Sequence, residues 1–284
     1  MRRASVCLFF LFCVFVGRTP AGAQFAPPNE SGVTLAHIHL IVADMEAHKQ
    51  FWTAIMGGKL IDRGPFTMVA FPEVFLTLQK GQPTGPSEGS VLNHFGFGYK
   101  DLSAQIARWK EQSADVRVNP NGNQGYVFGP EGVRVEFAAD PELPAPFRMD
   151  HLHMNVPDIP AAQAWYEKNF GGRTGQRKRN SGPGVVECSY FPDTTISFTT
   201  VGGRGGGAAA AASAPLLPTK GRGIDHFGFD VTNLNALVKK LQTNGITFDV
   251  LPQMIRGTSI MSAFLTDPWG NSIELTENFA SAAP

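Results

Sequence analysis

Six of the seven histidines in this chain lie on four short segments in which apolar and polar residues alternate, as they do in β-strands. These six are His37, His39, His94, His151, His153 and His226. The seventh, His48, lies in a stretch with helical periodicity. A single histidine on a strand is usually structural, but six at equivalent positions indicate a shared chemical role, such as metal ligation or proton transfer.

Strand alternation indicates which way these side chains point, because successive residues face opposite sides of a sheet. His37 and His39 lie on one face of their segment, and the apolar residues lie on the other. On the second and fourth segments, a glycine follows the histidine on the same face, at Gly96 and Gly228. We expect these glycines to leave that face open for a ligand.

Two glutamates complete the candidate sites, since Glu136 and Glu274 each lie on the polar face of a late strand in one half of the chain. Each glutamate alone could simply be an exposed charged residue on a strand. Because both lie on the same face as two histidines, once in each half, we favour a role as metal ligands. Two imidazoles and one carboxylate, with other positions open, suit Fe(II), Mn(II) or Zn(II). One such ion per site would bind two substrate oxygens and stabilise a developing enolate or alkoxide.

These segments belong to an internal duplication. With a shift of 114 residues, segment 37–44 matches segment 151–158, including both histidines and an aspartate. With a shift of 132 residues, segment 93–97 matches segment 225–229. The boundary between the halves lies in the proline-rich stretch 140–148.

Each half contains two modules, and each module begins with a strand followed by an amphipathic helix. We expect the opening strands at 37–42, 94–99, 151–156 and 226–231, and the helices at 47–56, 102–112, 161–170 and 234–244. Two or three further strands follow in each module. The Gly- and Ala-rich segment 202–223 is expected to be a flexible loop between modules three and four.

The first 23 residues have the layout of a secretory signal peptide. Arg2 and Arg3 precede an apolar run, and small residues end at Ala23. The apolar run 6–16 is much shorter than the roughly 20 residues that span a bilayer, so a membrane anchor is not expected. We therefore expect an exported protein, periplasmic or extracellular, without membrane attachment after cleavage.

The 24 basic and 24 acidic residues balance, and loss of Arg2, Arg3 and Arg18 would leave 21 basic residues against 24 acidic ones. This near-neutral charge disfavours nucleic acid as a partner. After cleavage Cys188 would be the one remaining thiol, so no internal disulfide is expected. The expected partner is a small-molecule substrate, and the sequence is compatible with a homo-oligomer.

The pattern resembles the vicinal oxygen chelate superfamily, which includes glyoxalase I, extradiol dioxygenases, and fosfomycin and bleomycin resistance proteins. The resemblance rests on the spacing from histidine to aspartate in 37–44 and 151–158, on Asp-His-Phe-Gly-Phe at 225–229, and on Asp-Pro-Trp-Gly-Asn-Ser-Ile-Glu-Leu at 267–275. It covers nearly all of the chain beyond the signal segment. These motifs are specific for the fold but not for the reaction.

The resemblance implies an α+β fold of four βαβββ modules paired into two domains with cupped mixed sheets. The first domain would be residues 33–140, with modules one and two, and the second residues 148–279, with modules three and four. Of the two, the C-terminal half matches the family motifs more closely.

The resemblance also implies the roles of individual residues. The metal ligands would be His37, His94 and Glu136 in the first domain, and His151, His226 and Glu274 in the second. His39 and His153, one strand step away, would donate protons or hold the ligands in place. Tyr126, ten residues before Glu136, matches a tyrosine of extradiol dioxygenases, whereas the C-terminal half has Phe264 at the matching position.

The resemblance implies a metal-dependent enzyme, dioxygenase-like or lyase/isomerase-like, whose small substrate chelates the metal through adjacent oxygens. Glyoxalase I sites need a further acidic ligand on segments 75–78 and 196–199, and this chain has no acid there. The alternative is a non-catalytic small-molecule binding protein of the bleomycin-resistance type, with aromatic walls and no metal. A third hypothesis makes one half catalytic and the other structural.

Overall fold

The computed structural model describes residues 25–179, 183–192, 194–200 and 215–282. The expected signal peptide, residues 1–23, lies outside the described residues, as does much of the Gly- and Ala-rich segment. Within the described part of the chain, no helix has the length and apolar character needed to cross a membrane.

Four modules follow one another, and each starts with a strand and a helix and continues into three antiparallel strands. The first contains β1 (Val33–Val42), α1 (Met45–Gln50) with its π-helical continuation η1 (Phe51–Ile55), β2 (Lys59–Arg63), β3 (Phe66–Phe71) and β4 (Val74–Lys80). The second contains β5 (Leu92–Tyr99), α2 (Leu102–Glu111), β6 (Asp115–Val118), β7 (Gln124–Phe128), the short η2 (Pro130–Gly132) and β8 (Arg134–Ala139). The third contains β9 (Phe147–Val156), α3 (Ile159–Phe170), β10 (Arg173–Lys178), β11 (Val185–Tyr190) and β12 (Thr195–Thr200). The fourth contains β13 (Ile224–Val231), α4 (Leu234–Thr243), β14 (Val250–Met254), β15 (Met261–Thr266) and β16 (Ser272–Glu277), and η3 (Phe279–Ala282) follows it.

The helices begin at the same point of each module because a capping side chain follows the opening strand. In each case its oxygen accepts a hydrogen bond from the backbone N–H three residues later, at Asp44, Asp101, Asp158 and Asn233. Such a cap satisfies one of the free N–H groups in the first turn. The aspartates that match between the halves are therefore helix caps rather than site residues.

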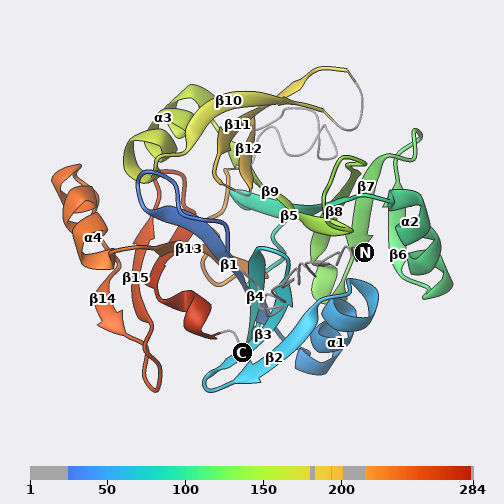
Figure 1. Cartoon of the computed structure of the whole chain (residues 1–284), viewed down its shortest axis with the longest axis horizontal. Coiled ribbons are helices and arrows are strands. Elements are labelled where there is room, and N and C mark those ends of the chain that lie inside the picture. Colours follow the sequence, from blue (N-terminus) through green and yellow to red (C-terminus); the bar gives the residue numbers. More distant parts are fainter. Residues whose placement is uncertain (1–24, 180–182, 193, 201–214, 283–284) are drawn as a thin grey trace, which may run out of the picture.

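The modules assemble into two eight-stranded mixed sheets (Figure 1). One sheet has the order β14-β15-β16-β13-β1-β4-β3-β2 and joins modules four and one. The other has the order β10-β11-β12-β9-β5-β8-β7-β6 and joins modules three and two. The modules meet at their opening strands, where β1 pairs with β13 and β5 pairs with β9, both antiparallel. Each sheet therefore contains one module from each half of the chain.

The connecting segments fit this pairing. Only the short segment 140–146 separates β8 from β9, which keeps modules two and three in one sheet. The much longer segment 201–223 separates β12 from β13, so the chain can return to the sheet that module one began.

The last part of that long segment is not the flexible loop expected from its composition. Leu217 pairs with Ser90, and the Thr219 N–H donates to the Gly270 carbonyl at 3.0 Å. The Gly223 N–H donates to the carbonyl of Gly85 at 3.0 Å. Backbone hydrogen bonds thus hold residues 215–223 against the rest of the protein.

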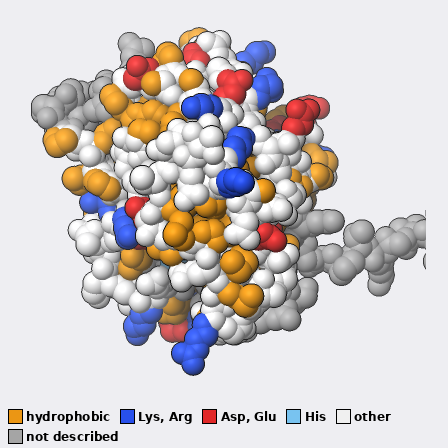
Figure 2. All heavy atoms as spheres, turned by 90° about the vertical axis from the view of Figure 1, so that its left-hand side faces the viewer, with side chains coloured by type: hydrophobic (Ala, Val, Ile, Leu, Met, Phe, Trp, Pro, Cys, Tyr) orange, Lys and Arg blue, Asp and Glu red, His pale blue; other side chains and the backbone are white. Residues whose placement is uncertain are grey.

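One large apolar core lies between the helices and the sheets. Its members include Trp52 and Trp109, which are fully buried, and the apolar residues of the opening strands, such as Ile38 and Phe95. Figure 2 shows the outer face on the side of α3, α4 and β14, where apolar side chains are scattered among charged ones. Because the apolar face of each opening strand points into this core, the histidines lie on the opposite, concave face.

Candidate metal centres

In each sheet, a glycine on the middle of three neighbouring strands separates a histidine from a glutamate. His37 on β1 lies opposite Gly228 on β13, which in turn lies opposite Glu274 on β16. A Cβ atom at Gly228 would lie 2.0 Å from Cε1 of His37, so no larger residue fits there. The glycine thus makes room for an imidazole from the other half, and not for a ligand as expected.

The first centre comprises His37, His226 and Glu274, all of which are buried. Nε2 of His37 lies 2.9 Å from Oε2 of Glu274, and Nε2 of His226 lies 3.2 Å from the same oxygen. Nδ1 of His226 contacts the Asp225 carboxylate at 2.5 Å, and the Ser262 hydroxyl donates to Oε1 of Glu274 at 2.5 Å. Asp225 therefore orients Nε2 of His226 toward the glutamate.

The second centre comprises His94, Glu136, His151 and His153. Nε2 of His94 lies 2.9 Å from Oε2 of Glu136, and Nε2 of His151 lies 3.9 Å from the same oxygen. Gly96 lies between His151 and Glu136, and a Cβ there would come within 2.6 Å of Cε1 of His151.

Acceptors behind the second centre orient its histidines. Nδ1 of His94 contacts Oδ1 of Asn93 at 2.8 Å, and Nδ1 of His151 contacts Oδ2 of Asp150 at 2.7 Å. Each contact turns Nε2 of the ring toward Glu136, which is the arrangement found behind histidine ligands to metals.

The six predicted ligands therefore do come together in two groups of three, but the groups differ from the predicted ones. The sequence pattern grouped His37 with His94 and Glu136, and grouped His151 with His226 and Glu274. In the structure, each glutamate instead meets a histidine from each half. The prediction of one triad per half is wrong, because the opening strands of all four modules have equivalent edges and their residues do not specify which strands pair. That these six side chains bind metal stays a prediction.

Two of the predicted proton-transfer residues belong to the second centre, although the sequence placed them in different halves. The Tyr126 hydroxyl donates to Oε2 of Glu136 at 3.0 Å. The His153 ring stacks on His94 with centroids 4.6 Å apart, and its Nε2 lies 2.7 Å from Oγ1 of Thr199.

The third, His39, lies beside the first centre. Its ring stacks on His226 with centroids 4.4 Å apart. Its two nitrogens contact the Thr77 hydroxyl at 2.9 Å and Oε1 of Gln79 at 3.0 Å. Phe264 packs edge-on against His226 where Tyr126 packs against His94, so the first centre lacks the tyrosine hydroxyl.

Burial and hydrogen bonds shift the pKa of His94 and that of His226 in opposite directions. Burial lowers the pKa of His94 to about 4, although its hydrogen bond to Glu136 acts in the opposite direction. Burial also disfavours charge on His226, but its hydrogen bonds to Asp225 and Glu274 outweigh burial and raise its pKa to about 9. Burial would raise the pKa of Glu136 and Glu274, yet the neighbouring histidines hold both well below the usual value. At the first centre, the hydrogen bonds to Asp225 and Glu274 therefore favour the protonated form of His226.

Apolar side chains fill the concave face at the first centre. Phe279 from η3 stacks on His37 with ring centroids 4.4 Å apart, and it is only 1% exposed. Phe25, Phe66 and Phe75 pack around Phe279. A cluster of aromatic side chains therefore packs against His37 at the first centre.

Polar and charged side chains surround the second centre. The Arg134 guanidinium lies 4.8 Å from the centre of the Tyr126 ring and contacts Asn93. Arg177 donates from Nε to the Ser197 hydroxyl at 3.2 Å and from Nη1 to Asp150 at 3.1 Å.

Sequence reasoning did not assign these arginines or Phe279 to the centres. Arg134 precedes Glu136 by two residues on the same strand face, so alternation could have placed it there. Arg177 lies on an outer strand, and Phe279 lies beyond the last repeated motif. No local sequence pattern predicts that these two side chains lie next to the centres.

The second centre fits a divalent metal. Nε2 of His151 is buried and has no hydrogen-bond partner among the described residues, although it lies 3.9 Å from Glu136. Two atoms bound to one tetrahedral ion at about 2.1 Å lie roughly 3.4 Å apart, so a shared ion requires little movement. At each centre, the candidate ligand atoms all lie within 4.8 Å of one another.

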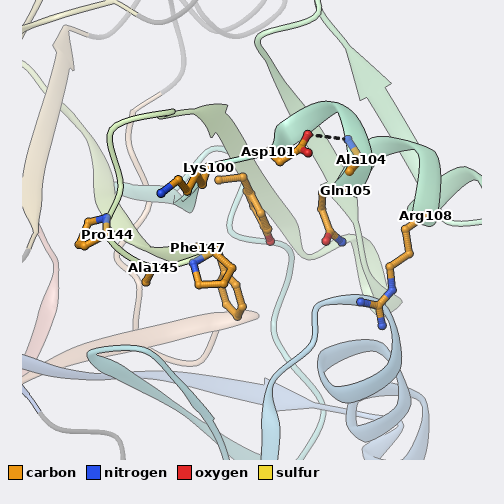
Figure 3. Close-up of a pocket in the computed structure, with 10 residues that line it drawn as sticks. Lys100, Asp101, Ala104, Gln105, Arg108, Pro144, Ala145 and Phe147 are labelled. Carbon is orange, nitrogen blue, oxygen red and sulfur yellow. Dashed lines mark hydrogen bonds between the residues drawn. The ribbon is translucent and has the colours of Figure 1, made fainter.

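A separate hollow of about 520 Å³ lies on the helix side of the second sheet (Figure 3). Lys100, Gln105 and Arg108 line one side, and segment 144–147 lines the other. Tyr99, which belongs to the apolar core, also lines it. The sheet therefore separates this hollow from the second centre.

Known proteins share this fold. Glyoxalase I from Zea mays superposes with a TM-score of 0.65 at 18% identity, covering 88% of this chain and 94% of its own. A candidate dioxygenase from Bacillus subtilis subsp. subtilis strain 168 superposes with a TM-score of 0.60 at 12% identity, covering 90% of this chain and 87% of its own. At such identities, the likeness establishes the fold alone.

Sequence comparison identifies the family. The protein YwbC from Bacillus subtilis (strain 168) is 27% identical over 118 residues, which are 36% of this chain and 93% of YwbC. Residues 34–137 and residues 148–275 both match one family model, and together these ranges span most of the chain. The chain therefore belongs to the Glyoxalase/Bleomycin resistance protein/Dioxygenase superfamily.

Proposed function

We propose that this protein is a metal-dependent enzyme, dioxygenase-like or lyase/isomerase-like, that acts on a small substrate with adjacent oxygens. The observation that carries this proposal is the buried Nε2 of His151, which has no hydrogen-bond partner within the described part of the chain. It faces the oxygen of Glu136 that His94 also contacts. A buried polar atom without a partner is costly, and a shared cation would satisfy it.

We assign the reaction to the second centre. A divalent ion held there by His94, Glu136 and His151 would polarise the substrate oxygens as a Lewis acid. His153 and Tyr126 lie around these ligands and are the groups that can exchange protons with a substrate. The first centre has equivalent ligands but a phenylalanine cover, so we assign it a structural ion.

The first test is metal analysis of the purified protein after loading with Fe(II), Mn(II) or Zn(II). We expect two equivalents per chain in the wild type and one in each of His151→Ala and His37→Ala. His48→Gln is the matched control, because it changes a buried histidine outside both centres and should retain two equivalents. A wild type that cannot be loaded would refute the proposal.

The second test is turnover of a panel of catechols, α-hydroxy ketones and hemithioacetals. We expect His151→Ala to abolish any activity and His37→Ala to retain it. Oxygen uptake that requires Fe(II) would identify a dioxygenase, and isomerisation without oxygen uptake would identify a lyase or isomerase. Tight ligand binding that chelators leave unchanged would support a binding protein instead.

We also propose that the protein acts outside the cytoplasm, on the basis of the expected signal peptide at residues 1–23. N-terminal sequencing of the protein made in its host tests this, with Gln24 as the expected first residue.

A further inference from the structure

We propose that the substrate of the second centre carries a negative charge, which Arg134 and Arg177 recognise from opposite sides of the metal ligands. This inference rests on the proposed function, since it concerns the same site. It follows from where the two guanidinium groups lie and from the balance of charge around them.

The two arginines flank the second centre on the concave face. Arg177 extends from β10 and reaches Asp150, which itself contacts Nδ1 of His151. Arg134 extends from β8, and its Nη2 lies 3.4 Å from Nδ1 of His94. Arg134 therefore lies beside His94, and Arg177 is linked to His151 through Asp150, so the two arginines flank the second centre on either side.

Neither guanidinium has all of its N–H donors hydrogen-bonded among the residues that the structure describes. The side chain of Arg134 is 12% exposed, and its Nε is buried without a hydrogen-bond partner among the described residues. Arg177 is 17% exposed, and it donates from Nε to Ser197 and from Nη1 to Asp150. A guanidinium has five N–H donors, so both side chains retain donors for an anion.

The charges leave the second centre positive once metal is bound. Glu136 and Asp150 contribute two negative charges, and the two arginines, which stay protonated, contribute two positive ones. A divalent ion then adds a net charge of about +2. Glu88 is 3.7 Å from Arg134 but is 68% exposed, so solvent screens much of its charge.

The matching position of the first centre supports this assignment. Ser272 on β16 occupies the place of Arg134 on β8, two residues before the glutamate. There Phe279 stacks on His37. The charge of Arg134 is therefore particular to the second centre, whereas Arg63 stands at the sequence position that matches Arg177.

The test compares lactate with lactamide, which offer the same adjacent hydroxyl and carbonyl oxygens but differ in charge. Binding to the Mn(II)-loaded protein is measured by paramagnetic broadening of the methyl proton resonance of each probe. We expect lactate to bind about tenfold more tightly than lactamide, with an affinity that falls as salt rises. A Glu136→Gln variant should lose the lactate signal, which assigns the signal to the second centre.

Arg134→Met and Arg177→Met should each weaken lactate binding about tenfold and leave lactamide binding and Mn(II) content unchanged. Arg117→Met is the matched control, because Arg117 is an exposed arginine on the same sheet whose loss changes the net charge equally. Equal binding of both probes, no lactate binding, or an equal effect of all three substitutions would overturn the inference while leaving the metal centre intact. Failure to bind Mn(II) would instead refute the proposed function.

Discussion

His37 and Glu274 lie 237 residues apart in the chain, yet Nε2 of one is 2.9 Å from Oε2 of the other. The contact crosses Gly228, whose missing side chain provides the space for the imidazole. His151 and Glu136 face each other across Gly96 in the same way. The two glycines are therefore needed for the histidine and the glutamate to approach each other, and substitution of a glycine tests this.

Gly96→Ala should disrupt the second centre, because the new Cβ would lie 2.6 Å from the His151 ring. We expect a loss of about 1–3 kcal/mol in the free energy of unfolding and loss of one metal equivalent. Gly98→Ala, on the same strand, is the control, since its Cβ would have no neighbour closer than 3.5 Å. Denaturant unfolding and metal analysis measure both effects. Equal behaviour of the two variants would contradict this role of Gly96.

Phe279→Ala should open the first centre by removing the ring that stacks on His37. We expect the free energy of unfolding to fall by about 3–5 kcal/mol, as for other buried phenylalanines. Metal should leave the first centre faster, while the second centre keeps its metal. Ser281→Ala in the same short helix is the control because Ser281 is exposed. Unchanged metal release in Phe279→Ala would show that the ring does not cover the site.

Tyr126→Phe reproduces at the second centre the residue type that Phe264 provides at the first. The loss of the hydrogen bond to Glu136 should weaken metal binding there by about tenfold, without effect on the first centre. The free energy of unfolding should fall by about 1 kcal/mol. Tyr190→Phe removes an exposed hydroxyl bonded to the Gln176 carbonyl and should leave metal affinity unchanged. Competition with a chelator measures the affinity.

Asp230→Asn should change how stability depends on pH. Burial raises the pKa of Asp230 to about 6, although its hydrogen bonds from Phe279 and Thr276 partly oppose this. Between about pH 4 and pH 6, the folded protein therefore binds more protons than the unfolded chain, and stability falls as pH rises through that range.

Asparagine keeps the acceptor oxygen without the charge. The free energy of unfolding of Asp230→Asn, relative to that of the wild type, should therefore be about 1–2 kcal/mol higher at pH 7.5 than at pH 4. The size allows for the partial exposure of Asp230. Urea unfolding at both pH values provides the measurement. A gain that is the same at both values would show that ionisation of Asp230 is not its cause.

The fold could be predicted further than the site. Repetition of strand, cap and helix predicts four modules, because alternation and capping are local properties that the residues carry themselves. Alternation also identifies the face on which His37 and Glu274 lie. Which modules share a sheet depends on how equivalent strand edges meet, and neighbouring residues do not encode this. The cover provided by Phe279 and the approach of Arg177 arise only when distant strands are brought together.

The cross-pairing of the modules makes the halves of the gene mutually dependent. Each centre takes a histidine from one half of the chain, and both a histidine and a glutamate from the other half. Either half expressed alone would therefore lack part of each ligand set. We expect the two fragments to form complete centres only when they are mixed and associate.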